Sequence, residues 1–164
     1  MRLHFSRAYL SAAYAALFVC VLASSIFAQA PDPHLGVWKL NLAKSKYDPG
    51  PAPKSATSTW EVVAAGTKVS TDGIAADGTP RRWESITKYD GKDSPITGAN
   101  PEGDTVARTR VDERTVRSVT KKGGKVTITQ TSVVSPDGKT RTVTTTGVNA
   151  AGQKVNNIAV YERQ

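Results

Sequence analysis

After residue 30 the sequence contains no cysteine, no methionine and no phenylalanine, and His34 is its only histidine there. Without thiols that part of the chain can form no disulfide and no zinc site with Cys ligands. A Ser-His-Asp relay would need to take its base from a terminal lead-in segment. We therefore expect no enzyme, no cofactor and no metal site, and a domain whose stability comes from its core alone.

Carboxylates offer little more chemistry. Glu61 and Glu84 lie in predicted strands and could act as a glycosidase pair, but nothing in the sequence sets their spacing. Asp90, Asp93 and Asp104 lie near glycines, yet their spacing does not match the helical calcium-loop pattern. Turn formation explains these three aspartates more simply.

Residues 1–30 have the three parts of a secretory signal peptide in the required order. These are a basic start with Arg2 and Arg7, an apolar run over 10–27, and a small-residue cleavage motif at Ala28-Gln29-Ala30. We predict cleavage before Pro31, a periplasmic or secreted protein, and a single mature domain over 31–164. The alternative is an uncleaved membrane anchor, because the apolar run is about long enough to span a bilayer when tilted.

The charge of the whole chain is +8, from 22 basic and 14 acidic residues. Loss of Arg2 and Arg7 with the signal leaves 20 basic and 14 acidic residues, a net charge of +6. This excess biases the protein toward anionic ligands or an anionic envelope surface. No aromatic-basic motif, zinc-finger spacing or basic helix indicates a nucleic acid partner. After cleavage we expect no stable membrane anchor.

Downstream of residue 55, short runs rich in threonine and valine are separated by turn dipeptides, among them Asp77-Gly78, Gly123-Gly124, Asp137-Gly138 and Ala151-Gly152. Glycine accepts the positive φ that tight hairpin turns need. Gly124, Gly138 and Gly152 are spaced 14 residues apart, which fits one strand and one turn, repeated. The pattern predicts an antiparallel meander.

We predict nine or ten strands, and no segment has an apolar stripe of helical period. Their ranges are 35–41, 56–64, 67–75, 80–89, 94–98, 104–111, 114–121, 125–134, 140–148 and 155–162. The proline-rich segment 42–55 is predicted to be an extended connector without a helix. So many strands without helices must hide one face, which predicts an all-β, up-and-down, closed barrel, with a β-sandwich as the alternative.

The two ends of the predicted barrel resemble those of known families. Gly36-Val37-Trp38-Lys39-Leu40 resembles the opening strand of lipocalins and intracellular fatty-acid-binding proteins, and Ile158-Ala159-Val160-Tyr161-Glu162-Arg163 resembles the closing strand of the latter. That resemblance implies a barrel whose first and last strands pair. The fatty-acid-binding Arg-x-Tyr clamp is not carried over, because Ala159 occupies the arginine position before Tyr161. The helical lid of that family is also absent from the pattern.

More of the chain resembles a group of small exported bacterial proteins without an assigned activity. The resemblance lies in Lys44-Ser45-Lys46, Pro49-Gly50-Pro51, Tyr89-Asp90-Gly91-Lys92-Asp93, Thr97-Gly98 and Asn156-Asn157. It implies export but supplies no chemistry.

The candidate ligand-binding residues are Arg108, Arg110 and Tyr161. Arg108 and Arg110 share a strand face, and Arg117 follows on the next strand, so three guanidiniums could converge on an acidic ligand. The alternative is a solvated outer face. Trp38 is expected to pack at the bottom of the barrel.

Two functions from different classes remain open. The first is a barrel that binds a small apolar or weakly acidic molecule in its interior. The second is an envelope structural or interaction protein with a filled barrel and a basic outer surface. A cavity distinguishes them, because a lumen filled by side chains favours the second and an open lumen of several hundred cubic ångströms favours the first.

Overall fold

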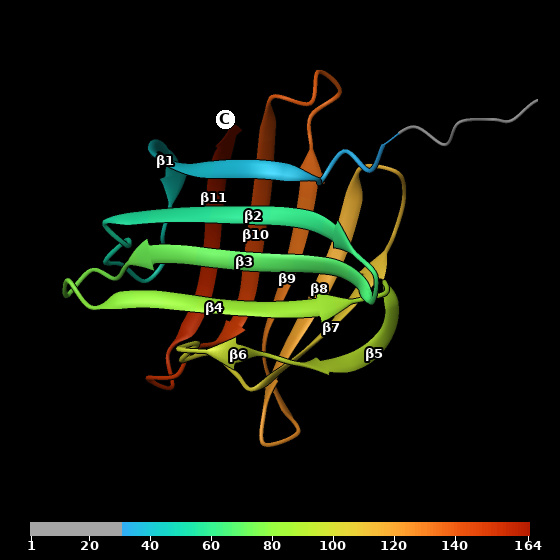
Figure 1. The fold of residues 1–164 in the computed structure, drawn as a ribbon. Helices are drawn as coiled ribbons and strands as arrows, with labels where there is room; N and C mark the ends of the chain where they lie inside the picture. The colour runs from blue at the N-terminus through green and yellow to red at the C-terminus, as the bar shows by residue number, and fades with distance from the viewer. Residues whose placement is uncertain (1–30) are drawn as a thin grey trace, which may run out of the picture. The chain divides into compact units, whose positions relative to one another are not determined.

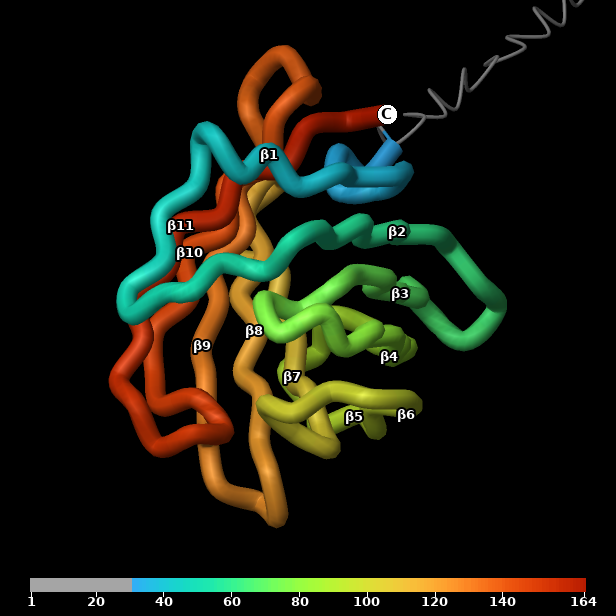
Figure 2. The backbone as a smooth tube through the Cα atoms, turned by 90° about the vertical axis from the view of Figure 1, so that its left-hand side faces the viewer, coloured from blue at the N-terminus to red at the C-terminus, as the bar shows by residue number. Residues whose placement is uncertain are grey.

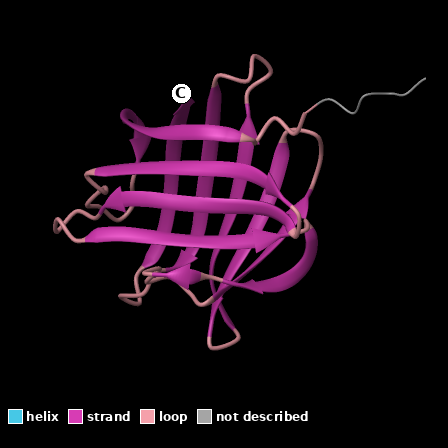
Figure 3. Cartoon of the chain, viewed as in Figure 1, coloured by secondary structure: helices cyan, strands magenta, loops and turns pink. Residues whose placement is uncertain are grey.

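The computed structural model describes residues 31–164, and the predicted signal peptide with its cleavage motif lies outside these residues. The described residues form eleven antiparallel strands and no helix (Figures 1 and 3). The strands are β1 Gly36–Lys46, β2 Ser55–Val63, β3 Gly66–Ile74, β4 Pro80–Thr87, β5 Asp90–Pro95, β6 Thr97–Gly98, β7 Thr105–Arg110, β8 Thr115–Lys122, β9 Lys125–Val134, β10 Thr140–Val148 and β11 Lys154–Arg163. Over the same range, no helix is long and apolar enough to cross a membrane.

All strands belong to one sheet, in the order β5-β7-β8-β9-β10-β11-β1-β2-β3-β4-β6. The sheet curls into a nearly closed barrel (Figure 2), in which β11 pairs with β1 as the meander requires. The predicted all-β barrel is confirmed, and the two-sheet alternative is wrong. The barrel is not sealed, because β4 and β5 are not paired and β6 returns to pair with β4, which leaves one seam.

Two strand predictions need correction. The expected strand over 94–98 is two short strands, β5 and β6, which pair with different neighbours. The first strand continues past residue 41 to Lys46, which pairs with Ile158 of β11 after a register shift. Within the shifted segment, the Oγ atom of Ser45 donates to the carbonyl oxygen of Asn41 and accepts from the Val160 N–H. The connector that follows contains no helix, as predicted.

The hairpin turns lie where the glycines predict them. Gly124, Gly138 and Gly152 have φ angles of 77°, 68° and 78°, and each lies between two paired strands. Alternation along β9 places Ile128, Ser132 and Val134 inward. Val126 is an exception and is exposed, because the pairing of β8 with β9 shifts register beside it.

The closed end of the barrel is built around Trp38, whose side chain is fully buried. It packs with Trp60, Val69, Val116 and Val134, which confirms its predicted packing role. Trp38 lies opposite Arg163 in the β1–β11 pairing, and the Arg163 guanidinium carbon lies 4.2 Å from a Trp38 ring centroid. The start of β1 and the end of β11 are thus packed together at one end of the barrel.

Candidate ligand-binding site

The inner face of the barrel is more polar than an ordinary core. Eight hydroxyl side chains are buried there: Ser58, Thr67, Ser85, Thr87, Ser118, Thr120, Ser132 and Thr145. The inward positions of the threonine-rich strands therefore do not all carry apolar side chains. Such an interior can offer hydrogen bonds to a bound molecule.

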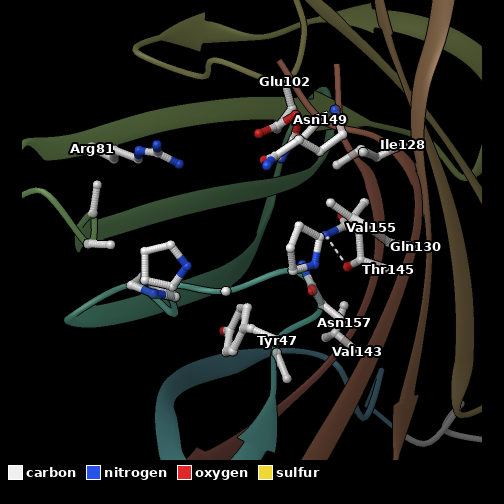
Figure 4. Close-up of a pocket in the computed structure, with 18 of the residues that line it drawn as sticks. Tyr47, Arg81, Glu102, Ile128, Gln130, Val143, Thr145, Asn149, Val155 and Asn157 are labelled. Atoms are coloured by element: carbon white, nitrogen blue, oxygen red, sulfur yellow. Dashed lines mark hydrogen bonds between the residues drawn. The ribbon is translucent and has the colours of Figure 1, made fainter. Parts of the chain in front are cut away.

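A cavity of about 470 Å³ opens at one end of the barrel (Figure 4). Its rim includes the proline-rich connector, from Tyr47 to Pro53, and the polar side chains of Arg81, Glu102 and Asn149. Its wall is formed by inward residues of β9, β10 and β11, namely Ile128, Gln130, Val143, Thr145, Val155, Ala159 and Tyr161. The predicted extended connector thus borders the opening.

A second cavity of about 100 Å³ lies deeper in the barrel. Gln130, Val143 and Tyr161 line both cavities, so the two adjoin. The remaining lining of the deep cavity comes from Ser58, Trp60, Val69, Thr71, Trp83, Arg108, Ser118, Ser132 and Arg141. Two arginines, Arg108 and Arg141, therefore line a deep cavity that adjoins the cavity at the rim.

Arg141, on β10, is 3 % exposed. Its Nε and Nη1 atoms are buried and have no hydrogen-bond partner among residues 31–164. Aromatic rings surround its guanidinium instead. The guanidinium carbon lies 5.1 Å from a Trp38 ring centroid, 5.1 Å from Trp60 and 4.9 Å from Tyr161. Cation–π contacts favour a guanidinium in this position, but they leave N–H groups at its edge without acceptors.

Arg108, on β7, is also 3 % exposed. Its Nη1 atom donates to the Oγ atom of Ser85 over 2.9 Å and lies 3.5 Å from Oγ1 of Thr87, both on β4. Its Nε atom is buried without a partner among the described residues. Arg108 therefore joins the two sides of the unsealed seam from the inside of the barrel.

Burial lowers the pKa of Arg108 and that of Arg141 to about 10, because removal from water disfavours the charged form. Both remain protonated at neutral pH. The titratable groups whose charges shift the pKa of Arg141 are tyrosines and other arginines, and no carboxylate is among them. The deep cavity thus carries positive charge that no acidic side chain within residues 31–164 compensates.

The opposite end of the barrel is closed by the lead-in segment 31–35. His34 is fully buried there, its Nε2 atom lies 3.1 Å from the Arg114 carbonyl oxygen, and its own carbonyl accepts from Trp38 Nε1 over 2.8 Å. Burial lowers the pKa of His34 to about 4, so it is neutral at pH 7 and donates from Nε2. It lines neither cavity and forms part of the closure.

Arg110 does not join the candidate site. It pairs with Asp32, and its guanidinium carbon lies 4.4 Å from the Tyr89 ring centroid, at the closed end of the barrel. Tyr89 also donates to Asp32 over 3.2 Å. The prediction that Arg108 and Arg110 converge is wrong, because Arg110 is the last residue of β7 and its side chain contacts Asp32 in the lead-in segment. Arg117 is exposed on β8 and does not converge either.

Arg108 and Tyr161, two of the three candidate ligand-binding residues, both line the deep cavity. The solvated outer face considered for Arg108 is wrong, since its side chain points into the lumen. The residue that sequence reasoning missed is Arg141, which lies directly opposite Tyr161 in the β10–β11 pairing. The sequence did contain a sign of its inward position: Arg141 alternates with Val143 and Thr145 along the strand, so the three side chains share one face.

The glutamates considered for catalysis line neither cavity of the lumen, and Glu84 lines a separate pocket of about 520 Å³ beside β4 and β5. Glu61 and Glu84 are half exposed and both pair with Lys68, at 3.3 Å and 3.4 Å. Within residues 31–164, no group of three or more His, Cys, Asp or Glu side chains is arranged to hold a metal ion. The lumen is therefore the feature of the described structure with the clearest chemical character.

Comparison with known proteins gives no further assignment: no protein-family model, no curated protein and no solved structure matches the chain.

Proposed function

We propose that this chain is an exported binding protein that holds one small, apolar or weakly acidic molecule inside its barrel without acting on it chemically. The observation that carries the proposal is the cavity of about 470 Å³ that leads from the rim into the lumen. Ligand pockets for small molecules typically have volumes of about 300–1,000 Å³. A barrel that served only as an envelope structural protein would need no such space.

The lining suits a ligand with an apolar body. Ile128, Val143, Val155 and Ala159 offer aliphatic surface from three adjacent strands. Burial of apolar ligand surface against such a wall contributes about 25 cal/mol per Å² before the costs of association. Tyr161, between the two cavities, would orient the polar end of the molecule. These contacts support binding and supply no general base or nucleophile.

The neutral fluorophore N-phenyl-1-naphthylamine tests this proposal, because its emission rises when it enters an apolar cavity. We expect saturable binding of one molecule per barrel. Val143→Trp fills the space between the two cavities and should abolish the signal. Val133→Trp, an outward position on neighbouring β9, is the matched control and should bind the fluorophore like the original protein.

The two tryptophan variants must first show the same far-ultraviolet circular dichroism as the original protein. Loss of binding in Val143→Trp alone supports the lumen as the site. Equal binding by both variants, or no saturable binding by the original protein, contradicts the proposal and favours the surface-interaction alternative.

A further inference from the structure

We propose that the ligand is a small organic acid whose single anionic group, a carboxylate or a sulfonate, occupies the deep cavity beside Arg141 and Arg108. This inference rests on the proposed function and names the class of molecule that the lumen takes. It follows from what the two guanidiniums lack within the protein.

Two buried positive charges lie in the lumen, and burying them is costly. Arg108 and Arg141 are each 3 % exposed, and neither forms an ion pair within residues 31–164. A buried charge is costly unless a partner of opposite sign or a full set of hydrogen bonds compensates it. A fold that keeps two such charges in one lumen gains stability when an anion enters.

Several N–H groups of the two guanidiniums have no hydrogen-bond acceptor within residues 31–164. The rings of Trp38, Trp60 and Tyr161 interact with the charge of Arg141, but an aromatic ring accepts no strong hydrogen bond from the guanidinium edge. The Nε and Nη1 atoms of Arg141 and the Nε atom of Arg108 stay without partners in the described structure. Oxyanions match guanidinium N–H groups in both charge and geometry.

A buried serine adds a hydroxyl group to the lining of the deep cavity. The Oγ atom of Ser132 is buried and also has no partner among the described residues, and Ser132 lines the deep cavity with both arginines. A serine hydroxyl can donate to an anion. The deep cavity of about 100 Å³ has room for a small acidic group, and the larger cavity adjoins it for the remainder of the molecule.

The same features argue against other occupants. A cation would face two positive charges and no carboxylate. A neutral alcohol or amide could accept a hydrogen bond but would leave the charge uncompensated. An acid with an apolar body fits both cavities, because its anionic group would pair with the arginines of the deep cavity and its apolar part would pack against the aliphatic wall of the larger one.

A matched pair of fluorophores tests the inference. 8-Anilinonaphthalene-1-sulfonate has the same aromatic skeleton as N-phenyl-1-naphthylamine and adds one negative charge. In Arg141→Met we expect the affinity for the sulfonate to fall about tenfold or more, because hydrogen bonds to charged groups are lost. The affinity for the neutral fluorophore should stay within about twofold, since its contacts are apolar.

Arg117→Met is the control, because Arg117 is an exposed arginine on the same barrel and a surface charge acts on a ligand only through screened attraction. Its affinities for both fluorophores should match those of the original protein. Arg141→Lys keeps the charge and should retain more affinity for the sulfonate than Arg141→Met. If Arg141→Met does not fold, Arg108→Met provides the same comparison from the other side of the cavity.

The outcomes separate the two proposals. Selective loss of sulfonate affinity in the buried-arginine variants supports the acid. If the buried-arginine variants bind both fluorophores as tightly as the original protein does, or lose affinity for both equally, the proposal of an acidic ligand is overturned. The proposal that the chain is a binding protein would still hold. Equal sensitivity of sulfonate binding to Arg117→Met and Arg141→Met places the probe on the surface and overturns the acid as well. No saturable binding of the neutral fluorophore overturns the proposed function itself.

Discussion

Arg108 on β7 donates a 2.9 Å hydrogen bond to Ser85 on β4, across the one seam where the described barrel has no backbone pairing. β7 and β4 are each second from an end of the sheet order, so this buried hydrogen bond links the two edges of the sheet where backbone pairing is absent. The same hydrogen bond positions the buried charge of Arg108 and links strands on the two sides of the seam.

Ser85→Ala removes the closest acceptor of Arg108 and leaves Thr87, at 3.5 Å, as the remaining one. We expect a loss of about 1.5–3 kcal/mol in the free energy of unfolding, because the acceptor served a buried charged donor. Urea denaturation followed by tryptophan fluorescence measures it. Ser55→Ala, at an exposed serine on β2, is the control and should change stability by less than about 0.5 kcal/mol. Equal stability of the two variants would show that Arg108 does not hold the seam.

Arg141→Met should leave the protein at least as stable as the original. An apolar side chain of similar length removes an uncompensated buried charge, and replacements of buried ionic groups by hydrophobic ones are often neutral or stabilising by about 1–4 kcal/mol. Thermal unfolding without ligand measures this. A fall of several degrees in Tm would mean that the aromatic contacts of Arg141 outweigh its desolvation and that the residue serves the fold.

His34 should make stability depend on pH. Its folded pKa of about 4 lies below the usual value of 6.5, so the unfolded chain binds the proton more readily. The stability that neutral His34 contributes is complete above pH 6.5 and is lost as pH falls toward 4, by roughly 3 kcal/mol in total. Urea denaturation between pH 7 and 5 follows this loss.

His34→Gln keeps a donor for the Arg114 carbonyl and removes the titration. Its free energy of unfolding should change less between pH 7 and 5 than that of the original protein. The comparison stops at pH 5 because the carboxyls of Asp77, Asp112 and Asp137, whose pKa values are lowered by hydrogen bonds, affect stability at lower pH. Parallel pH curves for the two proteins would contradict a neutral, buried His34.

Arg163→Lys should weaken the closure at the chain ends. Arg163 donates from Nη2 to the Pro33 carbonyl over 2.6 Å and from Nε to the Gly138 carbonyl over 2.7 Å, which a single ammonium cannot reproduce. We expect a loss of about 0.5–1.5 kcal/mol, because Arg163 is exposed and lysine keeps the charge. Faster amide hydrogen exchange at Leu35 would locate the effect. Exchange there at the original rate, with stability unchanged, would show that the lead-in is held by other contacts.

The sequence was sufficient to predict the barrel because its turns are marked by glycine at regular spacing and its strands by threonine and valine. Gly124, Gly138 and Gly152 all adopt the positive φ that this prediction requires. The region between Tyr89 and Asp104 was not predictable in the same way. Its strands are short, and pairing with distant partners, rather than local residue preference, decides where β5 and β6 lie.

The site was predictable only in part. Tyr161 and Arg108 were found, but Arg110 was grouped with Arg108 by parity alone, and parity cannot show that Arg110 lies at the end of the strand beside Asp32. Arg141 was missed because charged residues are rarely fully buried without a partner, so its inward position breaks the usual pattern. Such violations are expected at functional sites.

Native mass spectrometry of the protein purified from the cells that produce it tests the central claim most directly, with Arg141→Met and Arg117→Met purified in parallel. We predict that the original protein and Arg117→Met each retain one small acidic molecule per chain, and that Arg141→Met retains far less of it. A bare mass for the original protein, or the same retained molecule at the same occupancy in all three, would contradict a lumen that holds an organic acid beside Arg141.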